Sequence, residues 1–261
     1  MIRVIVSDLD GTLLGTDHRV AGETLAAVAA ATRGGIRFMI ATSRNYPGLP
    51  EELKNSGLIR DYILNGGAQI REGDGKIVER FPLCREVCRE VYRAVKGRDV
   101  SFLISSDDRD DTVLTENALE EILEKENVYK IYLWSREPSG LHTIREVLRH
   151  NHGITVTSSY INNLEITDRK AKKGPVLENY LVRLGYKMEE VMVIGDSMND
   201  YSMLSMDFGI TVAMGNAVPE VKRIAKYITK TNDEFGVAYA VRTVMERQNK
   251  EIRAAERRGE K

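Results

Sequence analysis

The stretch VSDLDGTLLG, residues 6–15, decides how the rest of the chain is interpreted. It ends an apolar run that begins at Ile2 and has the composition of a buried β-strand. Directly after that run come two aspartates one residue apart, Asp8 and Asp10, followed by Gly-Thr. Two carboxylates held this close at a strand end repel each other, so the rest of the chain must supply a group that makes them tolerable.

The composition excludes several classes of function. The chain has 261 residues, enough for one large domain or for a core that carries a smaller second domain. Its 38 basic residues nearly balance its 39 acidic ones, so we expect neither a nucleic acid nor an anionic membrane as a partner. No apolar stretch approaches the length of a membrane span, and Asp8 interrupts the N-terminal apolar run too early for a signal peptide. We therefore predict a cytoplasmic protein; the sequence does not indicate its oligomeric state.

The chain has two cysteines, Cys84 and Cys88, in a segment with helical periodicity. Residues four apart share one helix face, where a disulfide between them is disfavoured. Two ligands are too few for a structural zinc site. We predict reduced thiols that contribute to packing.

Strand-like apolar runs alternate with amphipathic, helix-like runs, which predicts an α/β fold with a doubly wound, Rossmann-like parallel sheet. Strands are predicted over 2–8, 36–44, 61–67, 191–196, 208–216 and 226–231, and helices over 24–35, 47–57, 174–185, 199–206 and 236–248. The highly charged end, 251–261, is expected to fray.

A separate α/β module is predicted between residues 83 and 162, where three amphipathic helices are interleaved with the strands SFLIS, YKIYLW and ITVTSS. We expect residues 1–82 and 163–261 to form the core. Within the module, Tyr132 and Trp134 share one strand face, which serves either sheet packing or the stacking of a substrate. The acidic run DDRDD at 107–111 lacks the pattern of a calcium loop and is interpreted as a solvated loop.

Four chemically active positions follow predicted core strands or begin helices beside them. They are Asp8 with Asp10, Thr42, Lys173, and Asp196 with Asp200. Ligands of doubly wound sheets bind at the carboxyl ends of the strands, so the fold is expected to bring these residues to one rim.

The chemistry of this set indicates metal-assisted phosphoryl transfer. Clustered carboxylates become tolerable around a divalent cation, and hard oxygen ligands suit Mg²⁺. We expect Asp10 to bind the metal through its backbone carbonyl, which keeps its carboxylate available as a general acid. Asp8 is then free to act as a nucleophile that forms an aspartyl-phosphate. Lys173 and Thr42 would neutralise and orient the phosphoryl oxygens, and Gly11 would let the backbone turn its amides toward the anion.

These motifs resemble the haloacid dehalogenase-like (HAD) phosphatase superfamily. DLDGT at 8–12 is similar to its first motif, which implies that Asp8 is the nucleophile and Asp10 the general acid and base. ATSR at 41–44 resembles the second motif, which usually reads Ala-Thr-Gly-Arg in this branch, so Ser43 is a departure. GDSMND at 195–200 is similar to the fourth motif and implies that Asp196 and Asp200 surround the metal.

The resemblance also bears on the lysine and on the phosphate-binding loops. The third-motif lysine precedes a glycine and a helix in this branch, which selects Lys173, with Lys172 and Lys170 as alternatives. Asn199 would brace the lysine or the phosphate, and Arg44 would either contact substrate or tie down its own loop. NGG at 65–67 is similar to the family's Asn-Gly loop beside the cap opening. The expected substrate- and phosphate-binding residues are Gly11, Ser43, Arg44, Asn65, Gly66 and Asn199.

The predicted insertion lies between the second and third motifs, where the Cof-type (IIB) branch of the superfamily carries a large α/β cap of the C2 type. The resemblance therefore implies a Mg²⁺-dependent hydrolase of a small phosphorylated metabolite, with a sugar phosphate weakly favoured. One alternative is a phosphomutase of the same superfamily, which would pass the phosphoryl group to a sugar. Another is a signalling receiver in which the phosphorylated aspartate is a switch. The sequence does not identify the cap residues that contact a substrate.

Overall fold

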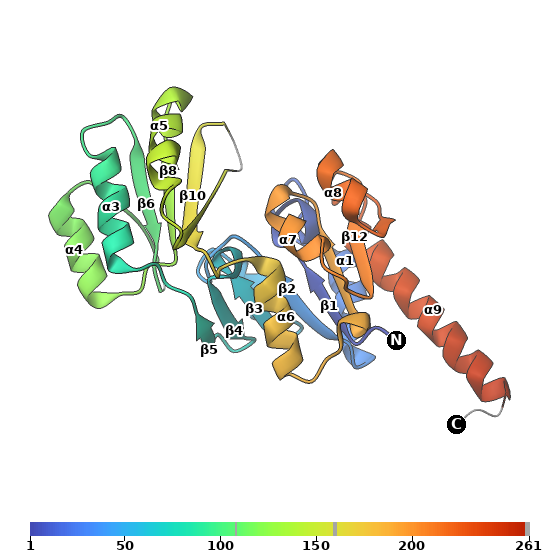
Figure 1. Cartoon of the computed structure of the whole chain (residues 1–261). Helices are drawn as coiled ribbons and strands as arrows, with labels where there is room; N and C mark the ends of the chain where they lie inside the picture. The colour runs from blue at the N-terminus through green and yellow to red at the C-terminus, as the bar shows by residue number, and fades with distance from the viewer. Residues whose placement is uncertain (108, 159–160, 259–261) are drawn as a thin grey trace.

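The computed structural model describes residues 1–107, 109–158 and 161–258. Within these residues the strands form two separate sheets, one of eight strands and one of five (Figure 1). The eight-stranded sheet has the order β13 (Tyr227–Ile228), β12 (Ile210–Ala213), β11 (Val191–Gly195), β1 (Val4–Ser7), β2 (Arg37–Ala41), β3 (Asp61–Leu64), β4 (Gln69–Glu72) and β5 (Ile77–Arg80). The five-stranded sheet has the order β7 (Asp110–Thr112), β6 (Ser101–Ser105), β8 (Lys130–Trp134), β10 (Asn163–Asp168) and β9 (Ile154–Thr157).

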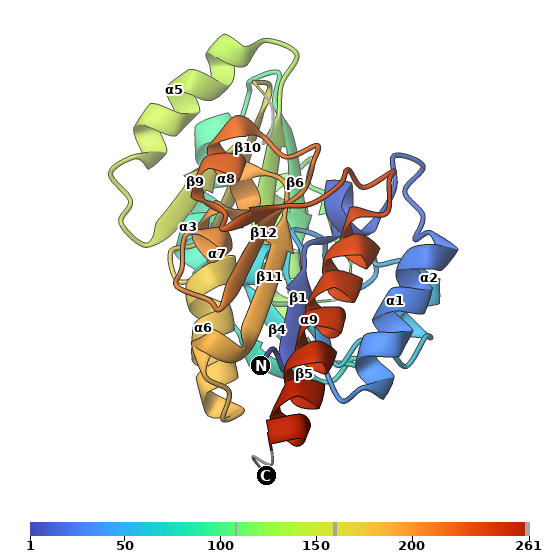
Figure 2. The same cartoon turned by 90° about the vertical axis from the view of Figure 1, so that its right-hand side faces the viewer.

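The large sheet is parallel over most of its width. β1 pairs in parallel with β2 and β11, and parallel pairing continues to β3 on one side and through β12 to β13 on the other. All four residues of β1 are buried, because helices cover both faces of the sheet (Figure 2). The predicted doubly wound α/β fold is confirmed.

The edge beyond β3 is antiparallel, which the sequence analysis did not predict. β4 pairs in antiparallel fashion with both β3 and β5. β4 and β5 have four residues each, and in β5 half-buried residues alternate with exposed ones. Neither strand therefore has the continuous apolar run of the inner, doubly covered strands.

Helices α1 (Gly22–Arg33) and α9 (Gly236–Arg258) lie side by side on one face of the large sheet, and α6 (Lys173–Arg183) and α7 (Tyr201–Leu204) lie on the other (Figure 2). The short helix α8 (Pro219–Ile224) connects β12 to β13. In the described part of the chain, no helix combines the length and the apolar composition that a membrane crossing requires.

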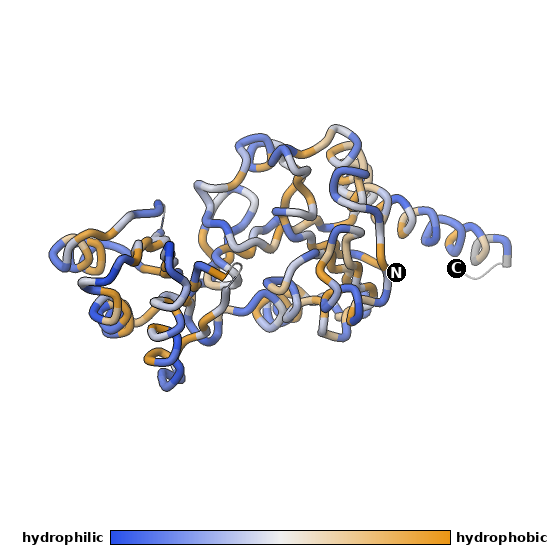
Figure 3. Tube along the Cα trace, turned by 90° about the horizontal axis from the view of Figure 1, so that it is seen from above, coloured by the Kyte–Doolittle hydropathy of each residue, from blue (hydrophilic) through white to orange (hydrophobic). Residues whose placement is uncertain are grey.

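Two predicted helix boundaries are wrong. The helix expected over 47–57 is limited to α2 (Glu51–Lys54), because Pro47, Gly48 and Pro50 disfavour helix before it. The charged end expected to fray from residue 251 continues α9 to Arg258, since its alanine, glutamate and arginine residues are strong helix formers. This outer part of α9 is mostly hydrophilic (Figure 3).

The second sheet is covered on one face by helices α3 (Arg85–Val95), α4 (Glu116–Lys125) and α5 (Pro138–Leu148) (Figure 1). These helices and the inward-facing side chains of β8 and β10 form a hydrophobic core of their own, distinct from the core of the large sheet. The apolar residues contributed by the two strands are Ile131, Leu133, Leu164 and Ile166. We call residues 83–168 the inserted module.

The predicted end of the inserted module at residue 162 is too early. β10, with six residues beginning at Asn163, pairs with β8 and β9 and so belongs to the second sheet. The chain returns to the core only with α6. Part of the acidic run at 107–111 also differs from the expected loop, because Asp110 and Asp111 begin β7; Asp108 lies outside the described residues.

The two cysteines are free thiols in different environments. Cys88 is fully buried in the core of the inserted module, as expected for a packing residue. Cys84 precedes α3 and is exposed, and its thiol lies 2.5 Å from a Glu86 carboxylate oxygen. Only Cys88 therefore has the predicted packing role.

A buried polar cluster joins the amino ends of β2 and β3 to α6. Arg37 Nε and Nη2 donate to the two carboxylate oxygens of Asp61 at 2.6 and 2.7 Å. The Tyr180 hydroxyl donates to Asp61 Oδ1 at 2.8 Å, and Asp61 is fully buried. These contacts satisfy a buried carboxylate and hold the three elements together at the end opposite the site described next.

Candidate active site

Three aspartates meet at the carboxyl ends of β1 and β11. Asp8 directly follows β1, Asp196 directly follows β11, and Asp200 ends the 3₁₀ turn Met198–Asp200. Each offers a carboxylate oxygen within 4.8 Å of the others. Because β1 and β11 pair in parallel, their ends bring residues 188 positions apart in sequence into one cluster, as the sequence predicted.

Lys173, the first residue of α6, is buried inside this cluster. Its Nζ donates to Asp8 Oδ1 at 2.6 Å and to Asp200 Oδ1 at 2.7 Å, and only 2% of the residue is exposed. Burial lowers the pKa of Lys173, but the charges of Asp200 and Asp8 outweigh burial and raise it, so the side chain stays an ammonium. Lys172 and Lys170 are both exposed, so of the three candidates Lys173 is the lysine that contacts the cluster.

One ammonium does not neutralise three carboxylates. Burial raises the pKa of Asp8 well above its usual range, the charge of Asp200 adds to this rise, and Lys173 opposes it. Burial and Asp200 likewise raise the pKa of Asp196 to about 6. A cluster of hard oxygen donors with excess negative charge fits a divalent cation such as Mg²⁺.

Asp200 is also tied into its own loop. Its Oδ2 accepts hydrogen bonds from the backbone N–H groups of Asp196 and Ser197, both at 3.0 Å. A Cβ at Gly195 would lie 2.6 Å from Asp200 Cγ, so only glycine fits there. Since Lys173 occupies the other oxygen, Asp200 braces the loop that presents Asp196 and is the least available of the three as a direct metal ligand.

Gly11 gives the backbone its turn beneath Asp196. Its φ is +74°, and a Cβ would lie 2.5 Å from Asp196 Oδ2. The Thr12 hydroxyl donates to Asp196 Oδ1 at 3.1 Å, and Asn216 Nδ2 donates to the Gly11 carbonyl at 2.8 Å. Neither Thr12 nor Asn216 was predicted as a site residue, although Thr12 lies in the DLDGT motif and Asn216 follows a core strand at its carboxyl end.

The carboxylate of Asp10 does not join the acidic cluster. It receives two hydrogen bonds from Arg44, from Nε at 2.8 Å and from Nη2 at 2.5 Å, and 47% of its side chain is exposed. Arg44 Nη1 also donates to the Gly48 carbonyl at 2.8 Å. Arg44 therefore ties its own loop to Asp10, which is one of the two roles considered for it.

Two further loops border the cluster and are linked to each other. Thr42 is buried, and its hydroxyl accepts the N–H of Arg44 at 3.1 Å. The N–H of Gly66 donates to the Thr42 carbonyl at 3.0 Å, and the N–H of Asn65 to the Arg44 carbonyl at 2.9 Å. Asn65 has a φ of +52° and Gly66 of +70°, so the NGG turn uses the left-handed region twice in succession.

Two neighbouring cavities, of about 300 and 400 Å³, lie between these loops and the inserted module. Both are lined by Ser43, Lys130, Glu165 and Asn199, and the smaller one also by Asn65, Gly66 and Lys173. Lys130, which the sequence analysis missed, comes from β8 and donates to the Ser43 carbonyl at 2.8 Å. Tyr132 lines the larger cavity and has Trp134 two residues further along its strand.

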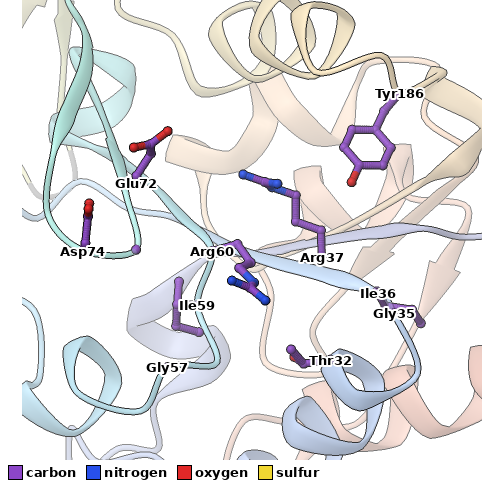
Figure 4. Close-up of a pocket in the computed structure, with 11 residues that line it drawn as sticks. Thr32, Gly35, Ile36, Arg37, Gly57, Ile59, Arg60, Glu72, Asp74 and Tyr186 are labelled. Atoms are coloured by element: carbon purple, nitrogen blue, oxygen red, sulfur yellow. The ribbon is translucent and has the colours of Figure 1, made fainter.

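A separate open cavity of about 670 Å³ lies at the amino ends of β2 and β3 (Figure 4). Its polar lining includes Arg37, Arg60, Glu72, Asp74 and Tyr186. Since Asp8 follows the carboxyl end of β1, this cavity is at the opposite end of the sheet from the acidic cluster and is not part of the site.

The chain is similar to known hydrolases in both sequence and structure. A family model of haloacid dehalogenase-like hydrolases matches residues 5–118 and 109–241. Phosphatase YwpJ of Bacillus subtilis (strain 168) is 28% identical in an alignment that covers 94% of this chain and 100% of the relative. The 5-amino-6-(5-phospho-D-ribitylamino)uracil phosphatase YcsE of the same strain is 30% identical, with 92% and 95% covered.

The solved structures that resemble the chain include a haloacid dehalogenase-like hydrolase from B. subtilis. It superposes with a TM-score of 0.83 at 26% identity and covers 92% of this chain and 99% of its own. The match extends over both the large sheet and the inserted module. The chain belongs to the haloacid dehalogenase-like hydrolases and is a phosphatase of their Cof-type branch.

Proposed function

We propose that the protein is a Mg²⁺-dependent hydrolase of small phosphomonoesters that works through an aspartyl-phosphate on Asp8. The observation that carries this proposal is the position of Asp8, which is buried against Lys173 and lies beside two further carboxylates. Lys173 itself lines the smaller cavity. Relatives with similar sequences support the substrate class: YcsE is named for a ribitylaminouracil phosphate, and a relative from Yersinia enterocolitica is named an HMP-PP phosphatase.

The proposed metal ligands are the carboxylates of Asp8 and Asp196 and the backbone carbonyl of Asp10. When bound, Mg²⁺ would offset the charge of the carboxylates and that of the phosphoryl group. Asp200 would contribute by fixing Lys173 and the backbone of Asp196, the contacts it makes in the structure.

In the first step, a carboxylate oxygen of Asp8 attacks phosphorus and the bond from phosphorus to the ester oxygen breaks. The departing oxygen takes a proton from the carboxylic acid of Asp10 and leaves as an alcohol. The Lys173 ammonium and the Thr42 hydroxyl would stabilise the phosphoryl oxygens while their charge is redistributed.

In the second step, water attacks the same phosphorus and Asp10, now a carboxylate, accepts a proton from it. The bond between Asp8 and phosphorus breaks, which regenerates the free carboxylate and releases inorganic phosphate. Asp10 must leave Arg44 for these transfers. Its exposure and its position on a turn are compatible with such a movement.

The inserted module would act as the cap that determines which ester is hydrolysed. It reaches the site through Lys130, which donates to the Ser43 carbonyl, and through Ser105, whose hydroxyl donates to Asn65 Oδ1 at 3.0 Å. A cap in this position would limit bulk water around the phosphorylated aspartate. It would also leave little room for a protein to dock on that aspartate, which argues against a receiver.

The test is phosphate release from a panel of about a hundred small phosphomonoesters, with Mg²⁺ and with EDTA. Mg²⁺-dependent release that EDTA abolishes supports the proposal, and loss of turnover in Asp8→Asn supports the assigned nucleophile. Near wild-type turnover in Asp8→Asn would show that another group attacks phosphorus. Isomerisation of a sugar phosphate that requires a bisphosphorylated sugar activator, without release of phosphate, would indicate the phosphomutase instead.

A further inference from the structure

We propose that Glu165 selects substrates by the charge of the end remote from the phosphate. The site would accept phosphomonoesters whose far end carries hydroxyl or amino groups, and would disfavour those with a second anionic group. This inference rests on the proposed function, because it concerns the leaving group of the same reaction.

The two faces of the second sheet have different chemistry. On β8 and β10 the residues that face the helices are all aliphatic, as described above. The alternate residues face the core and are mostly polar. Those that line the cavities are Lys130, Tyr132, Glu165 and Thr167, together with Thr155 and Thr157 of the neighbouring strand β9. A polar sheet face can simply face solvent, but these side chains line cavities beside the acidic cluster, where a polar ligand could contact them.

The strand register arranges this polar face in rows. Thr167 is paired with Lys130 on β8 and with Thr155 on β9. The Lys130 contact with Ser43 identifies this as the row nearest the core. Glu165 is two residues back along β10, in a second row with Tyr132 and Thr157. At roughly 3.3 Å per residue, the second row lies about 7 Å further from the core, which is the reach of a five- or six-carbon chain.

Charge changes sign between the two ends of the cavities. Near the core the lining cations are Lys130, Lys172 and Lys173, which suit a phosphate. In the second row the ionisable side chains that line the cavities are Glu165 and Tyr132, and Glu165 is only 9% exposed. On the larger cavity Asp110 adds another carboxylate and Arg44 a guanidinium, which is already paired with Asp10.

A carboxylate in this position distinguishes ligands by charge. It accepts hydrogen bonds from hydroxyl groups and forms an ion pair with an amine, whereas a second phosphate or a carboxylate is repelled. A like-charge contact in a partly buried site is expected to change kcat/KM on the order of 10- to 100-fold. Asn163, whose Nδ2 lies 3.5 Å from Glu165 Oε1, helps to hold the carboxylate in place.

The test compares two open-chain esters that differ only at the far end. Glucitol 6-phosphate ends in a hydroxyl group, and 6-phosphogluconate ends in a carboxylate. We expect wild type to prefer glucitol 6-phosphate at least tenfold in kcat/KM. Glu165→Gln, which keeps the shape and removes the charge, should reduce this ratio about tenfold. The ratio is measured within one protein sample, so it does not depend on the folded fraction of the variant.

The matched control is Glu121→Gln, an exposed glutamate on α4 outside both cavities, which should keep the wild-type ratio. A wild-type ratio near one, or an unchanged ratio in Glu165→Gln, would overturn the inference while leaving the phosphatase proposal intact. The inference would also be overturned if the enzyme hydrolysed p-nitrophenyl phosphate but neither glucitol 6-phosphate nor 6-phosphogluconate. If wild type with Mg²⁺ released phosphate from none of the three, the proposed function would fail and this inference with it.

Discussion

The Nζ of Lys173 lies 2.6 Å from Asp8 Oδ1, with both side chains buried where β1 ends and α6 begins. The ammonium reaches Asp200 as well, so one cation holds two carboxylates from different elements. The contact joins the proposed nucleophile to the helix that follows the inserted module. The two ion pairs of this one lysine therefore serve both the stability of the core and the geometry of the site.

Replacing Lys173 by methionine should abolish turnover and also destabilise the protein. The substitution leaves two buried carboxylates without their cation. Removing one partner of a buried ion pair typically lowers the free energy of unfolding by about 3–5 kcal/mol. The free energy of unfolding from urea titration measures this. Adding Asp200→Asn to Lys173→Met should recover part of the loss, because one of the unpaired charges is then removed. Strictly additive effects would show that the two side chains are not coupled.

The raised pKa of Asp196, about 6, makes the stability of the metal-free protein depend on pH. A carboxyl whose pKa is raised by folding stabilises the folded state below its unfolded pKa of about 3.9, and this contribution is lost as pH rises through 6. Without metal, Asp196→Asn should therefore be more stable than wild type at pH 7.5, by on the order of 1–3 kcal/mol, and the gain should vanish near pH 4.

Mg²⁺ should make wild type more stable than Asp196→Asn at pH 7.5, which reverses the order expected without metal. Binding to the folded state raises the melting temperature of wild type at pH 7.5, and less so at pH 5 where protons compete for the same carboxylates. Asp196→Asn should lose most of the Mg²⁺-induced shift. Asp207→Asn, which removes an exposed carboxylate far from the cluster, should keep it. Equal Mg²⁺ shifts in wild type and Asp196→Asn would mean that the ion binds elsewhere.

Asp10→Asn should lower kcat/KM for an alkyl phosphate by on the order of 10²–10⁴-fold, the usual contribution of general acid–base catalysis. The loss should be much smaller for p-nitrophenyl phosphate, whose leaving group needs little protonation. Since kcat/KM reports the steps up to phosphoryl transfer, this difference isolates the acid role from the later base role. Equal losses on both esters would argue against proton donation by Asp10.

Much of the core and of the site could be predicted because both depend on short-range patterns. The inner strands are continuous apolar runs, and DLDGT, ATSR and GDSMND each follow one of them. Parallel pairing then brings their ends together whatever their separation in sequence. The position of Lys173 at the start of α6 also follows from a local signal, a lysine before glycine and a helical run.

Features that depend on tertiary contacts were not predictable in the same way. Arg44 pairs with Asp10, and Lys130 donates to the Ser43 carbonyl. No motif in the sequence indicates that these segments meet. The end of the inserted module was misplaced because NLEITD is a half-buried strand whose partners are decided by the second sheet. The β4–β5 hairpin was missed because its strands are short and lie at an edge.

The polar cluster at the far end of the sheet offers a test of how rigidly the site is held. Arg37, Asp61 and Tyr180 join the amino ends of β2 and β3 to α6, while the opposite ends of these elements lead to Thr42, Asn65 and Lys173. Tyr180→Phe removes one hydrogen bond to a carboxylate that keeps its two bonds from Arg37. It should lower the free energy of unfolding by about 1–2 kcal/mol.

If this cluster only stabilises the fold, Tyr180→Phe should leave kcat and KM unchanged at a temperature where the variant is fully folded. If it also fixes the relative positions of the three elements, kcat should fall several-fold with KM nearly constant, because Lys173 and Thr42 would be aligned less often. We expect the second result, since α6 carries both Tyr180 and Lys173 on one short helix. The decisive measurement is kcat for wild type and Tyr180→Phe. Tyr227→Phe is the matched control, because Tyr227 is exposed on the edge strand β13 and its ring contacts Arg247.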